Sequence, residues 1–251
     1  MILDDIVRRT EKRVAQLPSS FPEPTATEHP SLSGAIRGRN GKNAVIAEIK
    51  CASPSRGIIR RNVDMAQMAG VLAGAGCVAL SVLTEPYFFG GTGLDIARVK
   101  TAVDIPVLRK DFIIDERQIA ESRALGADAV LLIAAVLGER LPGFVNLAMN
   151  YRLEPLIEVH NAAEAELALG TSAALIGINN RDLATMTIDR STTRLLSKQI
   201  RPEGRLIVSE SGMRSADDVR EMRNYCDAFL IGSSIMAHEQ PGKKLEEFVC
   251  A

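Results

Sequence analysis

The sequence has few cysteines, and their spacing argues against a metal site. Cys51, Cys77, Cys226 and Cys250 are scattered along 251 residues, with no CxxC pair among them. Cysteine-based zinc and redox motifs need thiols at close, regular spacing. We therefore expect no metal site, and we interpret the four cysteines as reduced thiols of a cytoplasmic protein.

An excess of charge of either sign is also missing. Lysine and arginine together number 30, aspartate and glutamate 31, and the formal net charge is -1. This balance does not indicate a surface that binds polyanions, so we expect no nucleic-acid partner. A local basic pocket remains compatible with it.

Long hydrophobic runs are absent as well. No apolar stretch approaches the roughly 18 to 20 residues that a helix needs to span a bilayer. The first residues, MILDDIVRRTEKRV, have the pattern of a charged amphipathic helix and lack the apolar centre of a signal peptide. We expect a cytoplasmic protein without a membrane partner.

What the sequence does contain is a regular alternation of two kinds of segment. Short apolar runs rich in β-branched residues are expected to be strands, and they cover 44–50, 77–84, 105–110, 129–136, 153–159, 174–179, 205–210 and 228–233. Segments with helical amphipathic spacing lie between them, as at 63–76, 115–127, 139–151, 162–170, 215–225 and 243–249. Strand runs that are apolar on both faces and separated by helices are typical of a parallel sheet with both faces covered.

The order of these segments predicts an α/β fold, one closed (β/α)8 TIM barrel. A doubly wound sheet is the alternative, but it usually needs fewer strands and often carries a glycine fingerprint for a nucleotide. Neither GxGxxG nor GxxxxGK[ST] occurs. We expect a single domain over 1–251. Its barrel would cover 44–251, after an N-terminal helical extension at 1–40 whose one or two helices are joined by a Pro/Ser/Thr-rich loop.

Polar residues stand at the carboxyl ends of the predicted strands, where barrel enzymes have their active sites. Glu48 and Lys50 end the first strand on one face, because side chains alternate along a strand. Lys110 ends the third strand. Later strands end in a further polar set, which includes Glu158, Asn179, Asn180, Arg181, Asp182, Ser209, Glu210 and Ser211. Two lysines and up to three glutamates are thus expected at one cavity mouth, and we interpret them as functional rather than as a structural ion-pair network.

The expected charges favour a particular protonation state for these groups. A lysine within about 4–6 Å of carboxylates keeps its proton, since the opposite charges stabilise the ammonium. Lys110 is therefore better suited to donate a proton than to attack as a free amine. A glutamate partly buried beside apolar residues has its pKa raised toward neutrality. One site would then hold both an acid and a base at neutral pH.

Two glycine- and serine-rich turns predict a phosphate site. SESG at 209–212 and IGSS at 231–234 place small residues and backbone N–H groups where helices begin. In barrel enzymes the loops after strands 7 and 8 commonly bind phosphate, and Gly212 and Gly232 would let the backbone approach an anion closely. Ser53 or Ser55, in the loop after the first strand, would close over the same ligand.

Seven blocks of sequence resemble one known family. In chain order they are EIKCASPSRG, LTEPYFFGGT, LRKDFIID, PLIEVHN, IGINNRDL, SESGM and IGSSIM. Their order and spacing resemble the indole-3-glycerol-phosphate synthase family from about residue 44 to the C-terminus, and the N-terminal helical segment fits too. The resemblance implies conversion of the phosphosugar 1-(2-carboxyphenylamino)-1-deoxyribulose 5-phosphate to indole-3-glycerol phosphate, with release of CO2 and water, in tryptophan biosynthesis. It implies no cofactor and no metal, and we expect a monomer.

The resemblance also implies a role for each matched residue. Lys110 would be the general acid that assists ring closure at the substrate carbonyl, and Glu158 and Lys50 would transfer protons during the dehydration. Glu48 and Asn179 would position the substrate and the lysines, and Glu210 and Ser211 would line the same cavity. The anthranilate carboxylate would meet Arg181, and its aromatic ring would be enclosed by Phe88, Phe112 and Leu131. The phosphate would be bound by Ser53, Gly212, Gly232 and Ser233.

A few residues depart from the family pattern or carry no chemical signal. Cys51 stands where the family often has a basic residue, and Phe89 adds a second phenylalanine in YFFGG, which leaves loop details open. His29, His160 and His238 fall in loop-like segments without metal-ligand spacing. We expect His160 to face solvent or to help start the next helix.

Two alternative functions remain open. One is another phosphosugar barrel enzyme, either an isomerase or a lyase that forms a Schiff base through Lys50 or Lys110. The other is a catalytically silent barrel that binds phosphosugars. The combination of Lys50, Lys110, Glu158 and Asn179 argues against a barrel that only binds phosphosugars, because binding alone does not require paired acids and bases.

Overall fold

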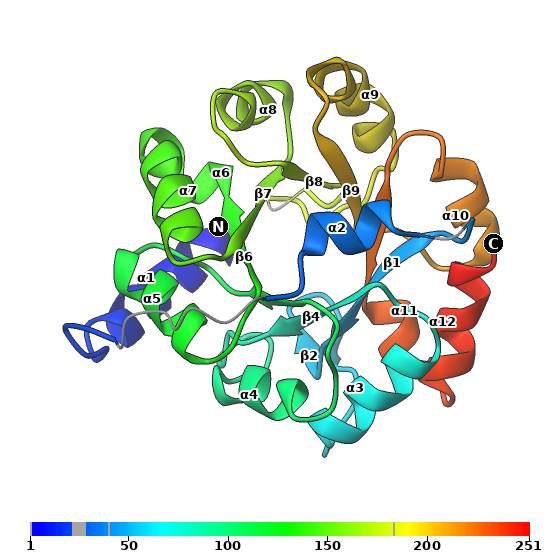
Figure 1. Ribbon diagram of the computed structural model, residues 1–251, viewed down its shortest axis with the longest axis horizontal. Helices are drawn as coiled ribbons and strands as arrows, with labels where there is room; N and C mark the ends of the chain where they lie inside the picture. Colours follow the sequence, from blue (N-terminus) through cyan, green and yellow to red (C-terminus); the bar gives the residue numbers. More distant parts are fainter. Residues whose placement is uncertain (1, 22–28, 40, 183) are drawn as a thin grey trace.

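The computed structural model in Figure 1 describes residues 2–21, 29–39, 41–182 and 184–251. Within these residues, parallel strands close into a barrel in the order β1-β10-β9-β8-β7-β6-β5-β4. The barrel strands are β1 Ala44–Ile49, β4 Ala79–Leu83, β5 Val107–Lys110, β6 Ala129–Ile133, β7 Glu154–Val159, β8 Leu175–Asn179, β9 Leu206–Glu210 and β10 Ala228–Ile231. The (β/α)8 prediction is confirmed.

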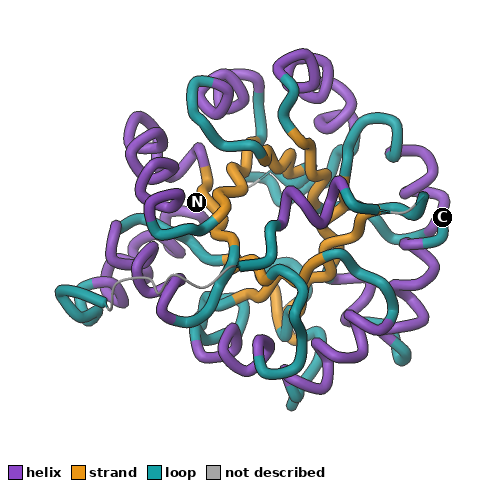
Figure 2. The backbone as a smooth tube through the Cα atoms, in the orientation of Figure 1, coloured by secondary structure: helices purple, strands orange, loops and turns teal. Residues whose placement is uncertain are grey.

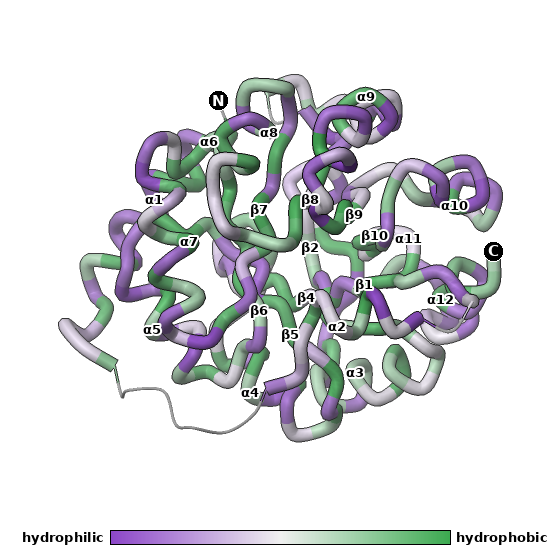
Figure 3. The backbone as a smooth tube through the Cα atoms, turned by 45° about the horizontal axis from the view of Figure 1, so that its top comes forward, coloured by the Kyte–Doolittle hydropathy of each residue, from purple (hydrophilic) through white to green (hydrophobic). Residues whose placement is uncertain are grey.

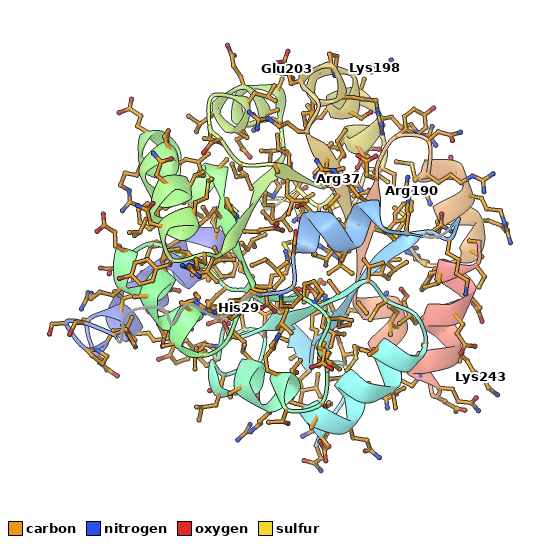
Figure 4. The ribbon with its side chains drawn as sticks, in the orientation of Figure 1. His29, Arg37, Arg190, Lys198, Glu203 and Lys243 are labelled. Atoms are coloured by element: carbon orange, nitrogen blue, oxygen red, sulfur yellow. The ribbon has the colours of Figure 1, made fainter. Side chains whose placement is uncertain are left out.

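Helices form a ring around the strands, as Figure 2 shows. After the N-terminal segment they are α3 Met65–Gly74, α4 Leu94–Lys100, α5 Glu116–Ala124, α6 Ala134–Leu137, α7 Leu141–Asn150, α8 Ala162–Leu169, α9 Ser191–Ile200, α10 Ala216–Met222, α11 Ser233–Met236 and α12 Pro241–Val249, with the 3-10 turns η1 Gly138–Arg140 and η2 Arg201–Glu203. A small antiparallel pair, β2 Ala52–Ser53 and β3 Gly57–Ile58, stands in the loop after β1. Charged side chains such as Lys198, Glu203 and Lys243 lie at the outer edge (Figure 4).

Two predicted strands extend into the helix that follows. The run 228–233 is a strand only as far as Ile231, and α11 begins at Ser233. The apolar run 129–136 is a strand only as far as Ile133, and α6 begins at Ala134. The run stays apolar because the short helix is itself buried at Ala134 and Leu137. A buried strand and a buried helix cannot be told apart from an apolar run alone.

Alternation along each strand separates two layers of core. In β1, Val45 and Ala47 face the surrounding helices, whereas Ala44 and Ile46 belong to the cluster inside the barrel. Figure 3 shows the mainly hydrophobic strands enclosed by helices with hydrophilic outer faces. Toward the carboxyl end the inward positions become polar, so that Glu48 follows Ile46 and points into the barrel mouth.

The two N-terminal helices, α1 Ile2–Val14 and α2 Leu32–Arg37, lie at different ends of the barrel. Helix α2 crosses the opening in Figure 1, and its Leu32 and Ile36 belong to the interior cluster. That cluster has small alanines at the first inward position of several strands, Ala44, Ala79, Ala129 and Ala228. These alanines leave space for the two larger side chains, which close this end.

Helix α1 lies at the end of the barrel where the strands have their carboxyl termini. Its Ile6 is buried, and Arg13 donates a hydrogen bond of 2.7 Å to the carboxylate of Asp111, just after β5. In the described part of the predicted helical extension at 1–40 there are two helices. Residues 22–28 of the predicted Pro/Ser/Thr-rich loop, and residue 40, lie outside the described residues. In the part of the chain that the structure covers, no helix is long and apolar enough to cross a membrane.

Candidate active site

A cavity of about 430 Å³ opens at the carboxyl ends of the strands. Side chains from α1, from the strand ends and from the loops that follow them line it. With the exception of Phe88, it collects every residue to which the family resemblance gave a role: Lys110, Glu158, Lys50, Glu48, Asn179, Glu210, Ser211, Arg181, Phe112, Leu131, Ser53, Gly212, Gly232 and Ser233. Three other members of the polar set at the strand ends do not line it: Asn180, Asp182 and Ser209. Residues from positions far apart in the chain thus share one concave surface.

Lys110 stands between two carboxylates at the base of this cavity. Its Nζ lies 3.0 Å from Glu158 Oε2 and 2.8 Å from Glu210 Oε2. Burial opposes the ammonium charge, but the negative charges of Glu158, Glu210 and Glu48 outweigh it and raise the pKa of Lys110 well above its ordinary value. The side chain is therefore a cation throughout the neutral range.

The residues on either side of Lys110 are engaged in other ion pairs, although Asp111 also lines the cavity. Arg109 points the other way, is 2% exposed, and pairs with Asp111 at 3.0 Å and with Glu121 at 2.7 Å. Asp111 is also held by Arg13 and by the Thr84 hydroxyl, at 2.7 Å in each case. Of the charged triplet, only Lys110 is free to meet a substrate.

The two carboxylates that flank Lys110 differ in protonation. Burial raises the pKa of Glu158, but Lys110 and His160 counter it and leave that pKa below its usual range. Burial, aided by repulsion from Glu158 and Glu48, raises the pKa of Glu210 to about 7 even against Lys110. Among the described residues, Glu210 Oε1 has no hydrogen-bond partner. Glu158 is thus an anion at neutral pH, while Glu210 exchanges a proton there.

Two glycines leave space for carboxylates of this group. A Cβ on Gly177 of β8 would lie 2.2 Å from Glu210 Oε1, and one on Gly232 would lie 2.4 Å from Glu48 Oε1. Nonbonded atoms do not approach each other this closely, so an alanine at either position would displace the glutamate carboxylate that it meets. Gly232, expected only at the phosphate site, therefore also accommodates Glu48.

A second lysine, Lys50, pairs with Glu48 at 2.6 Å. Lys50 lies just past the end of β1, and Glu48 is an inward residue of that strand. Asn179 ends β8, and its side-chain oxygen accepts a hydrogen bond of 3.0 Å from the backbone N–H of Arg181. That bond stabilises the backbone turn after β8 from which the Arg181 side chain reaches the cavity.

One end of the cavity is suited to anions. Ser211 and Gly212 both take positive φ, 64° and 96°, which turns the backbone sharply after β9; at Ser211 such a conformation is strained. The Ser53 hydroxyl is buried and, within the described chain, has no hydrogen-bond partner. It is therefore available to a ligand.

Two arginines of the cavity were missed in the interpretation of the sequence. Arg56 and Arg214 line the cavity together with Arg181. Burial lowers the pKa of Arg181, and the nearby charges of Arg56 and Arg214 lower it further. The signal was present in the block EIKCASPSRG, where Arg56 stands three residues beyond Ser53, and directly after the block SESGM, where Arg214 stands two residues beyond Gly212.

The opposite wall is apolar, and here one prediction must be corrected. Phe89, not Phe88, lines the cavity, and its ring centroid lies 6.2 Å from that of Phe112. Phe88 instead packs beneath the guanidinium of Arg9, at 5.6 Å. The buried Glu85 carboxylate accepts hydrogen bonds from the backbone N–H groups of both phenylalanines, at 2.7 and 3.2 Å. The carboxylate holds the chain in a tight turn. In such a turn the sequence alone does not show which of two adjacent phenylalanines faces the cavity.

Of the two expectations for His160, that it faces solvent was wrong, whereas its hydrogen bonds to Glu164 in the first turn of α8 agree with the other, that it helps to start this helix. Its side chain is only 12% exposed, and its Nε2 lies 3.3 Å from Glu158 Oε1. The next helix, α8, is capped by Asn161 rather than by the histidine. Of the described residues, no group of three or more histidines, cysteines or carboxylates is arranged to hold a metal ion.

The comparisons with known proteins identify a family. A profile described as indole-3-glycerol phosphate synthase matches residues 3–248. A protein of that name from Caldanaerobacter subterraneus subsp. tengcongensis is 43% identical over 99% of this chain and 98% of its own length. Another of the same name, from Bordetella pertussis, is 46% identical over 83% of this chain and 80% of its own. A solved structure of tryptophan synthase from M. tuberculosis is similar in fold alone, with a TM-score of 0.67, 12% identity, and coverage of 88% of this chain and 98% of that one.

Proposed function

The chain belongs to the indole-3-glycerol phosphate synthase family, and on this premise we propose that it converts 1-(2-carboxyphenylamino)-1-deoxyribulose 5-phosphate into indole-3-glycerol phosphate, CO2 and water in tryptophan biosynthesis. Because CO2 is lost as a carbon–carbon bond breaks, the enzyme is a carboxy-lyase. The observation that carries the proposal is the Lys110 ammonium, paired with two buried carboxylates between an apolar wall and an anion-binding end.

The two ends of the cavity match the two ends of this substrate. Phe89, Phe112 and Leu131 offer an apolar surface to the aromatic ring, and Arg181 is available to its carboxylate. At the other end, the phosphate would be held by small residues that let the backbone approach and by hydroxyl groups: Ser53, Gly212, Gly232 and Ser233. The sugar carbonyl then lies between these ends, over the lysines and glutamates.

Ring closure is the step assigned to Lys110. The ring carbon that bears the carboxylate attacks the sugar carbonyl, and a carbon–carbon bond forms as the carbonyl bond breaks. Lys110 donates a proton to the oxygen as negative charge develops there, which makes it a hydroxyl group. Loss of CO2 from the same ring carbon returns the bonding electrons to the ring and restores its aromaticity.

Dehydration completes the indole and needs a base as well as an acid. The ionised Glu158 takes the proton from the carbon next to nitrogen, and Lys50, held by Glu48, donates a proton to the hydroxyl group that leaves as water. Glu210 touches Lys110 at 2.8 Å and exchanges a proton near pH 7. It is suited to reprotonate Lys110 after ring closure.

The alternative functions fit the site less well. A Schiff-base lyase needs a neutral amine, and the carboxylates around Lys110 stabilise its charged form. A silent binding barrel gives no reason to bury two carboxylates against a lysine, since buried charges are costly unless they are paired and used. The groups named above come from the ends of strands around one barrel, so we propose that a single-domain monomer is active.

A fluorescence assay tests the proposed function. Purified protein is incubated with the carboxyphenylamino sugar phosphate, and indole fluorescence and released CO2 are followed together. We expect both to appear in equal amounts, with heat-denatured protein as the control. Substrate that is bound but not consumed would indicate a silent barrel, and consumption without an indole product would indicate a different phosphosugar enzyme.

A further inference from the structure

Glu158 is held from two sides, and only one of its partners lies in the cavity. Its Oε2 faces Lys110 at 3.0 Å, and its Oε1 faces His160 Nε2 at 3.3 Å. His160 is not among the lining residues that the structure describes, so it contacts the carboxylate from behind. The carboxylate group has one cation at each oxygen, and the two cations come from different segments of the chain.

The start of helix α8 fixes the imidazole of His160. Glu164, in the first turn of α8, accepts hydrogen bonds from His160 Nδ1 at 3.0 Å and from the His160 backbone N–H at 2.8 Å. The Asn161 side chain donates to the other oxygen of Glu164 at 2.6 Å. A carboxylate is favourable at a helix N-terminus, so Glu164 is a stable anchor, and Nε2 of the ring is left to face Glu158.

Both ring nitrogens therefore face carboxylates, which requires a doubly protonated ring. A neutral imidazole carries one N–H, and its other nitrogen would direct a lone pair at an anion. Burial opposes the charge most strongly, but the charges of Glu158 and Glu164, together with the hydrogen bond to Glu164, outweigh burial and raise the pKa of His160 to about 10. The other charged groups nearby are Lys110, beyond Glu158, and Asp182, in the loop after β8, whose pKa is lowered by backbone hydrogen bonds and more weakly by His160.

We propose that His160 is a positioning residue of the acid–base site: as an imidazolium anchored by Glu164, it holds one oxygen of Glu158 and keeps that carboxylate ionised with its other oxygen toward Lys110. This inference rests on the proposed function for its catalytic consequence, whereas the ion pair itself is independent of the reaction. Glu158 then starts each turnover as a base, and the proton that exchanges near neutral pH resides on Glu210.

The first test measures the ion pair without substrate. The chain has three histidines, so the His160 signal in proton NMR is assigned by its loss in His160→Gln. We expect that signal to remain that of a charged ring at pH 8 and to titrate near pH 10, and Glu164→Gln to move the titration to lower pH. A His160 signal that titrates at or below about pH 6.5, the ordinary value, would overturn the proposal.

The second test measures turnover. In His160→Gln we expect kcat to fall about 10- to 100-fold, the loss expected from one charge-assisted contact, with KM changed by less than about threefold. The acidic limb of the kcat profile should move to higher pH, because Glu158 without its imidazolium binds a proton more readily. Glu164→Gln should show the same shift with a smaller fall, and His238→Gln, an exposed histidine, should match the wild-type protein.

The results of these tests distinguish the proposed role of His160 from the proposed function of the protein. A merely structural role for His160 would reduce the amount of active protein and leave the pH profile in place, and that result would contradict the inference. Failure of the wild-type protein to make an indole would refute the proposed function instead. The NMR titration needs no turnover and would still decide the ion pair.

Discussion

Replacement of Gly177 by alanine tests the arrangement of the carboxylates more finely than removal of any one of them. The new Cβ would lie 2.2 Å from Glu210 Oε1, while the nearest side-chain atom of another residue, Leu156 Cδ1, is at an ordinary 3.5 Å. To reach an ordinary contact the Glu210 carboxylate must move by roughly 1 Å, and a misplacement of that size costs about 10²-fold in rate. We therefore expect kcat to fall about 100-fold, with KM nearly unchanged because Gly177 does not line the cavity walls that hold the ring and the phosphate.

The assay for this variant is a comparison of steady-state rates with two controls. Gly70→Ala, where a Cβ meets nothing within 4 Å in helix α3, should leave kcat unchanged and stabilise the fold by about 1 kcal/mol. In a Glu210→Ala background, Gly177→Ala should cost almost nothing further, because the carboxylate it displaces is gone. A Gly177→Ala variant with wild-type kcat, or one whose loss persists in full without Glu210, would refute the idea that the glycine acts through Glu210.

Three further predictions follow from the same cavity. Glu158→Gln keeps the shape and removes the base, so kcat should fall by about 10²–10⁴ while the substrate Kd, measured by titration, changes far less; near-normal kcat would move the proton transfer to another glutamate. Gly232→Val should raise KM strongly and weaken competition by inorganic phosphate, whereas unchanged inhibition by phosphate would remove this turn from the anion site. Phe89→Ala should raise KM several-fold because Phe89 lines the cavity, and Phe88→Ala is its matched control; the reverse order in kinetic assays would restore the assignment made from sequence.

The barrel could be predicted from the sequence because its strands are buried on both faces. Runs such as 129–136 and 174–179 are apolar almost throughout, and this pattern identifies parallel strands between helices. The boundary at Ile133 was missed for the same reason, since the strand and the helix α6 that follows are both buried. Lys110 and Glu158 were singled out because charged residues at the ends of core strands favour a functional site, although Arg109 and Asp111 show that such charges can also form structural ion pairs.

Other features of the site depend on neighbours that lie far apart in the chain. Glu158 and Glu210 are both glutamates at strand ends, and only the three-dimensional arrangement gives one the cations Lys110 and His160 and leaves the other with an unpartnered oxygen, among the atoms described. His160 lies in the block PLIEVHN, but nothing in that block indicates a charged imidazole, because its partner Glu164 stands four residues later on α8. The spacing of residues in the sequence can place them at the carboxyl ends of the strands, but it cannot show which of them is protonated.

The assignment of Lys110 as a protonated acid is the central claim, and intact mass spectrometry after reduction tests it most directly. Borohydride is added to the wild-type protein during turnover of the carboxyphenylamino sugar phosphate, while the appearance of the indole is followed in the same sample. An acid that never bonds to the substrate predicts indole formation and an unchanged protein mass. A protein heavier by the reduced substrate, with the added mass mapped to Lys110 or Lys50, would contradict the claim and establish a Schiff base in its place.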